Sequence, residues 1–85
     1  MDSKKYLDKV IEHLVRRTKI DYDEEMLYTP YTNITLSYSH LSFLLVSFKT
    51  FYRHCEEIYG LNYDETEYVW EEYKEIIRVK INNGK

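Results

Sequence analysis

Apolar side chains recur at helical spacing in three separate segments of this chain, and this pattern restricts the fold more than any other feature. In an α-helix, residues three, four and seven positions apart share one face, so such a stripe marks the side that packs on a core. The first stripe comprises Leu7, Val10, Ile11, Leu14 and Val15. The third comprises Val69, Trp70, Tyr73, Ile76, Ile77 and Ile81.

The second helix is expected to run from Leu41 to Tyr59 and to form the centre of the molecule, because its first half is apolar on nearly every side. Its stripe comprises Leu41, Leu44, Leu45, Phe48, Tyr52, Cys55 and Tyr59. Further apolar surface beyond that stripe comes from Phe43, Val46 and Phe51. One thin core is not expected to absorb all of it, which makes a homodimer a second expectation for this chain.

The junction between the second and third helices carries helix-stop and helix-start signals. Gly60 is expected to end one helix in the left-handed conformation of a Schellman motif, with Leu61 folding back as its hydrophobic contact. Asn62 and Glu65 match a capping box for the next helix, and Asp64 with Glu67 offers a second register. The short connection therefore predicts two helices joined by a tight turn.

The segment between the first and second helices favours extended structure. Residues 25–31 and 33–39 read as two extended pieces, and the second alternates apolar and polar side chains with the period of a half-buried strand. Pro30 supplies turn chemistry between them. A β-hairpin is predicted, and a long ordered loop with one short extended piece is the alternative. The expected fold is mainly α: one compact three-helix domain over residues 1–85, in the order α-β-β-α-α.

The single cysteine rules out an internal disulfide and favours a reducing, intracellular and cytoplasmic location. The N-terminal residues are charged and precede no apolar signal segment, and no apolar run is long enough to span a membrane. The chain contains no alanine and no glutamine, only two glycines and one proline, but ten tyrosines. Alanine, glycine and proline have GC-rich codons and tyrosine has AT-rich ones, so this composition fits an AT-rich genome. We therefore expect a virus, another mobile element or an AT-rich microbe as its source.

The residue types needed for catalysis or metal binding do not converge in this sequence. The soft-ligand candidates His13, His40, His54 and Cys55 lack zinc-ligand spacing, and Cys55 falls on a buried stripe. The acidic residues 21–25 lack the ligand spacing of a calcium loop. Two glycines are too few for a phosphate-binding loop. The sequence thus predicts neither an enzyme nor a bound cofactor or metal.

Charge is unevenly distributed along the chain. The first helix is basic, the third is acidic, and residues 29–48 contain no Asp, Glu, Lys or Arg. Tyrosine is common in recognition surfaces because it offers a large amphipathic contact at low entropic cost. The candidate interaction residues are Tyr28, Tyr31, Tyr38 and Tyr68. Tyr68 is expected to share a helix face with Glu72 and Glu75, which follow it at four and seven residues. The alternative is that these tyrosines cover the protein's own core. If Tyr31 contacts a partner instead, Tyr31→Ala should leave folding intact and weaken partner binding.

Nucleic-acid binding is the alternative function. The second and third helices resemble a helix–turn–helix, but the helix in the recognition position would begin with acidic residues, and the pI of about 5.6 opposes contact with phosphates. The first helix is the only basic element, and its candidate contacts are Lys5, Lys9, Arg16 and Lys19. The sequence therefore favours a small, non-enzymatic protein-interaction module with an unidentified partner, such as a viral modulator of a host protein.

Overall fold

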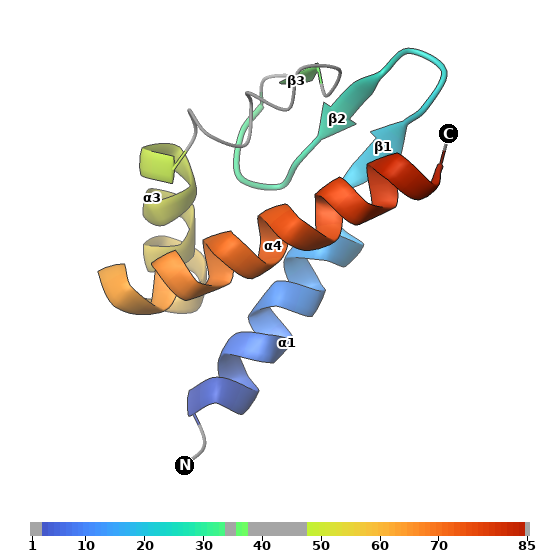
Figure 1. Ribbon diagram of the computed structural model, residues 1–85. Coiled ribbons are helices and arrows are strands. Elements are labelled where there is room, and N and C mark those ends of the chain that lie inside the picture. The colour runs from blue at the N-terminus through green and yellow to red at the C-terminus, as the bar shows by residue number, and fades with distance from the viewer. Residues whose placement is uncertain (1–2, 34–35, 38–47, 85) are drawn as a thin grey trace.

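The protein is mainly α-helical, with a small antiparallel sheet between its first helix and its two later helices (Figure 1). The computed structural model describes residues 3–33, 36–37 and 48–84. Its elements are α1 (Ser3–Arg16), β1 (Lys19–Asp21), β2 (Met26–Tyr28), β3 (Leu36–Ser37), α3 (Phe48–Tyr59) and α4 (Tyr63–Asn83). The mainly α fold with a β-hairpin is confirmed, and one additional strand makes the order α-β-β-β-α-α.

The sheet has the strand order β1-β2-β3, and both pairs are antiparallel. In the predicted hairpin, Leu27 of β2 pairs with Leu36 of β3. The additional strand, β1, places Ile20 opposite Leu27. The acidic residues 21–25 lie at the connection from β1 to β2, where the Asp21 carboxylate accepts a hydrogen bond of 3.1 Å from the Glu24 backbone N–H. Glu25 adopts the left-handed conformation there, with φ of 56°.

The apolar stripe of α1 packs into the core as its spacing predicts. Leu7, Val10, Ile11 and Leu14 are buried, and Leu14 is fully so. Beyond the end of α1, the Thr18 hydroxyl donates to the Leu14 carbonyl at 2.8 Å and lies 2.8 Å from the Tyr73 hydroxyl of α4. Since the Thr18 proton is engaged, the Tyr73 hydroxyl donates to Thr18. This bond gives the buried Tyr73 side chain its polar partner.

The central helix is α4, not the second helix as predicted. It is the longest helix and packs against both α1 and α3 (Figure 1). Its buried residues are Thr66, Val69, Trp70, Tyr73, Ile77 and Ile81. They run along its whole length because the apolar spacing continues through its turns, whereas only Phe51 and Cys55 of α3 are buried. The predicted helical residues 41–47 lie outside the described residues.

An aromatic cluster joins α3, α4 and the segment after β2. It consists of Tyr31, Phe51, Trp70 and Tyr73, all buried. The Phe51 and Trp70 ring centroids are 4.5 Å apart, and Tyr31 meets Phe51 edge-on at 5.1 Å. Phe51 was predicted to be surplus apolar surface available to a homodimer, and this is wrong, because it is completely buried. Phe43 and Val46, the other residues of that argument, lie outside the described residues.

The junction between α3 and α4 has the predicted stop and cap. Gly60 has a φ of 68°, its N–H donates to the Glu56 carbonyl, and Leu61 is buried. A second bond, from the Leu61 N–H to the Cys55 carbonyl at 3.3 Å, also closes this helix end, and neither bond has the spacing that defines a Schellman motif. Asn62 and Glu65 form the capping box: the Asn62 side chain accepts from the Glu65 N–H at 2.8 Å, and the Glu65 carboxylate accepts from the Asn62 N–H at 3.0 Å.

Replacing Asn62 by alanine is expected to lower the free energy of unfolding by about 1 kcal/mol, because the Glu65 backbone N–H at the start of α4 loses its side-chain acceptor. Urea denaturation followed by circular dichroism measures this difference. Asn83→Ala makes the same chemical change in the last turn of α4 and serves as the matched control. Equal midpoints for the two variants would contradict the role of the cap.

No helix in residues 3–33 and 48–84 combines the length and the apolar character required to cross a lipid bilayer. The longest, α4, carries charged side chains through most of its turns.

Candidate functional site

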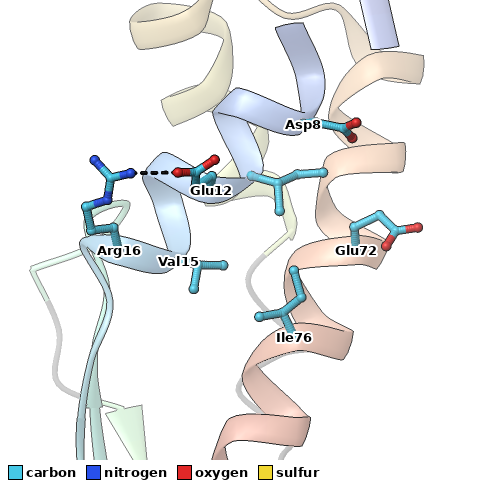
Figure 2. A pocket seen from close by; sticks show the side chains of 7 residues that line it. Asp8, Glu12, Val15, Arg16, Glu72 and Ile76 are labelled. Carbon is cyan, nitrogen blue, oxygen red and sulfur yellow. Dashed lines mark hydrogen bonds and ion pairs between the residues drawn. The ribbon is translucent and has the colours of Figure 1, made fainter. Parts of the chain in front are cut away.

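An open groove lies between α1 and α4 on the surface of the protein (Figure 2). It has a volume of about 450 Å³. Its lining residues are Asp8, Ile11, Glu12, Val15 and Arg16 of α1, with Glu72 and Ile76 of α4. We call this feature the α1–α4 groove.

Helical spacing brings these side chains together. On α1, Asp8, Ile11 and Val15 follow one another at three and four residues, and on α4 Glu72 and Ile76 are four residues apart, so each set shares a helix face. Ile11 is buried, whereas Val15 and Ile76 are only half-buried. These three aliphatic side chains form an apolar floor that the two helices do not close over.

The charged rim of the groove is acidic on balance. Glu12 and Arg16 form an ion pair of 2.7 Å in which both side chains are about 70% exposed, so the pair is screened by solvent and its charges offset each other. No salt bridge among the described residues reaches Asp8 or Glu72. Asp8 and Glu72 thus contribute two exposed carboxylates to the groove, one from each helix.

Tyr68 lies beside this acidic rim. It is half-buried against the core, and its hydroxyl donates a long hydrogen bond of 3.4 Å to the Asp8 carboxylate. Partial burial, followed by the negative charges of Asp8 and Glu72, raises the pKa of Tyr68 above its ordinary value. The sequence predicted that Tyr68 shares a helix face with acidic residues, and the structure adds that this face borders α1.

The other predicted interaction tyrosines do not gather on one surface. Tyr28 is exposed on β2, where Lys19 Nζ lies 5.9 Å from its ring centroid. Tyr31 is buried in the aromatic cluster, so the prediction that it offers a contact surface is wrong. Its ring fills the space between α4 and the segment after β2. Tyr38 lies outside the described residues.

The basic residues predicted for nucleic-acid contact are all exposed but are not concentrated. Lys5 and Lys9 lie on the outer face of α1, Arg16 is paired with Glu12, and Lys19 lies on β1 beside Tyr28. Because Glu12 interrupts the basic face of α1, the described residues form no continuous track of positive charge along a phosphate backbone.

Cys55 and His13, two of the candidate soft ligands, pack against other parts of the fold. Cys55 is fully buried on α3, and desolvation raises the pKa of its thiol to about 12, so it stays protonated at neutral pH. His13 Nδ1 lies 2.7 Å from the Tyr59 hydroxyl, which links α1 to the end of α3. In the described ranges, no three His, Cys, Asp or Glu side chains group as a metal site would require. His40 lies outside those ranges.

His54 gives the protein a pH dependence. Its ring meets Tyr59 edge-on at 5.9 Å. Burial, followed by the positive charge of Arg17, lowers the pKa of His54 below its ordinary 6.5; Glu57 opposes this and His13 adds to it. A protonated His54 is therefore disfavoured in the folded protein.

The free energy of unfolding is accordingly expected to fall as the pH drops below 6.5. In this range His54 binds a proton in the unfolded chain but not yet in the folded protein. This contribution is fully present above pH 6.5 and is lost as the pH falls through the lower folded-state pKa. Urea denaturation at pH 7.5 and pH 5 measures the change, and His54→Gln should show a smaller loss. An equal loss in both proteins would exclude His54 as the cause.

Part of the groove is recognisable from the sequence alone. Ile11, Val15 and Ile76 belong to the predicted core stripes. In the structure, Val15 and Ile76 are only half-buried, because the contact between α1 and α4 does not cover the full width of these stripes. Asp8, Glu12 and Glu72 were not singled out as site residues. No protein-family model, no curated protein and no solved structure matches this chain.

Proposed function

We propose that the protein is a small, non-enzymatic protein-interaction module whose docking surface is the α1–α4 groove. The observation that carries this proposal is the apolar floor of Ile11, Val15 and Ile76, which stays open to solvent between two charged rims. Apolar surface surrounded by polar residues is the usual composition of a protein contact. A partner that covers this floor would bury apolar surface of Val15 and Ile76 that α1 and α4 leave partly exposed.

The groove chemistry supports binding rather than covalent catalysis. Its lining side chains are carboxylates, one guanidinium and aliphatic groups, with no hydroxyl, thiol or imidazole among them. The one cysteine is buried and stays a thiol at neutral pH. A single cysteine and a composition typical of AT-rich coding support our placing this module in a reducing, cytoplasmic compartment, as a viral or mobile-element modulator of a host protein.

Affinity capture with the immobilised full chain tests this function. Val15→Lys places a charge on the apolar floor and should abolish retention of specific partners. Ile58→Lys makes a comparable change at an aliphatic side chain on α3 that is 59% exposed, and it should retain them. Circular dichroism melting confirms that both variants fold. Partners retained equally by all three proteins would show that docking does not use this groove.

A further inference from the structure

The two carboxylates that line the groove outside the Glu12–Arg16 pair, Asp8 and Glu72, lie toward the same end of the α1–α4 groove. Figure 2 shows Asp8 of α1 and Glu72 of α4 above Val15 and Ile76, with the Glu12–Arg16 pair set to the α1 side. The groove therefore has an acidic end and an aliphatic end. An occupant that contacts both ends of the groove would need a different kind of chemical group at each end.

The surroundings of Tyr68 give independent support for the acidic end. Tyr68 contacts Asp8 through its hydroxyl and precedes Glu72 by one helical turn. Asp8 therefore adjoins Tyr68 through the hydrogen bond, and Glu72 adjoins it on the next turn of the same helix face. A cation placed there would be attracted by two carboxylates.

The size of the groove limits its occupant to a short segment. A volume of about 450 Å³ is within the range of sites that hold a few side chains. A stable dimer interface buries on the order of 800 Å² on each partner, which seven lining residues do not supply. The groove by itself thus fits a peptide segment better than a second folded copy of the chain.

We propose that the α1–α4 groove binds a short amphipathic segment of a partner protein, with an aliphatic side chain on the Ile11–Val15–Ile76 floor and a lysine or arginine at the Asp8–Glu72 end. This inference rests on the proposed function and adds the chemistry of the partner. On a helical segment, an aliphatic and a basic residue three or four positions apart share one face and can reach both ends together.

The probe is a library of random 12-residue peptides displayed on phage and selected on the immobilised full chain. Peptides whose binding is lost with Val15→Lys but kept with Ile58→Lys are groove-dependent. We expect these peptides to be enriched in lysine or arginine next to an aliphatic residue. Their synthetic forms should bind the double variant Asp8→Asn, Glu72→Gln about three- to tenfold more weakly than they bind the wild type.

Glu67→Gln is the matched control, because Glu67 is an exposed carboxylate of α4 that does not line the groove. It should leave peptide affinity unchanged, and added salt should weaken binding to the wild type more than to the double variant. Groove-dependent peptides without basic residues, or an unchanged affinity of the double variant, would overturn the inference while leaving the docking function in place.

Two further outcomes are decisive. If no selected peptide depends on Val15, both the inference and the proposed docking surface are overturned. If sedimentation shows that the protein forms a dimer that Val15→Lys dissociates, the occupant is a second copy of the chain, and the foreign basic segment is excluded.

Discussion

Trp70→Ala should lower the free energy of unfolding by about 3–5 kcal/mol, the usual cost of removing a buried tryptophan side chain. Trp70 is only 4% exposed and contacts aromatic rings of α3 and of the segment after β2. Its ring centroid is 4.5 Å from that of Phe51, 5.9 Å from Phe48 and 6.1 Å from Tyr31. Truncation would remove all three contacts and leave a cavity at the junction of α3, α4 and the segment after β2.

This loss is large compared with the stability available. A chain of 85 residues has a total free energy of unfolding of about 4–13 kcal/mol, so a loss of about 3–5 kcal/mol removes a large share of it. Urea denaturation followed by far-ultraviolet circular dichroism measures the change. Trp70→Phe keeps an aromatic ring in the site and should lose less. A Trp70→Ala midpoint as high as that of the surface variant Ile58→Ala would show that the aromatic cluster does not carry this stability.

The helices were predictable because each has a long periodic stripe and clear end signals. In α1, Leu7, Val10, Ile11 and Leu14 are buried as their spacing indicates, and Gly60 and Asn62 mark the junction of α3 and α4. Such signals are local: they depend on side-chain spacing and on the hydrogen-bonding needs of helix ends.

The strand β1 and the central position of α4 were not predictable in the same way. Three residues, Lys19–Asp21, are too few to display a period, and β1 exists because its backbone pairs with β2. The second helix was expected at the centre from its apolar content. Which helix has two neighbours depends on the packing of all three, and α4 has buried residues along its entire length.

The candidate site depends on geometry that no single segment contains. Val15 and Ile76 belong to ordinary core stripes, and they form an open floor only because α1 and α4 leave a groove between them. Asp8 and Glu72 are sixty-four positions apart by their numbers and become neighbours of Tyr68 only in the folded chain. Sequence reasoning did place Tyr68 among acidic residues, because that relation lies on one helix.

Tyr31 lies in the uncharged segment that follows β2, and composition alone does not show whether such a tyrosine faces the core or a partner. A tyrosine has an apolar ring and one polar atom, so it suits both a contact surface and the margin of a core. The segment after β2 turns toward the helices, where the Tyr31 ring lies edge-on to Phe51 at 5.1 Å, to Trp70 at 6.1 Å and to Tyr73 at 6.2 Å. Tyr28, three residues earlier, faces solvent on the strand.

Tyr31→Ala is therefore expected to destabilise the fold by about 3–5 kcal/mol, in the range of other buried aromatic truncations, rather than to leave folding intact. Its ring is 5% exposed and fastens the segment after β2 to α3 and α4. Without the ring, three edge-on aromatic contacts are lost and the core opens beside Trp70. Urea denaturation measures the loss, and the fluorescence of Trp70, the only tryptophan, reports the change in its surroundings.

Tyr28→Ala is the matched control, because it removes the same side chain from a position that is 42% exposed, and it should change the free energy of unfolding by no more than about 0.5 kcal/mol. Tyr31→Phe keeps the ring and should retain most of the stability of the wild type. If Tyr31→Ala and Tyr28→Ala had the same midpoint, the Tyr31 ring would have to lie at the surface, where it could contact a partner. The difference between these two tyrosine variants thus decides whether the segment after β2 completes the protein's own core or is available for binding.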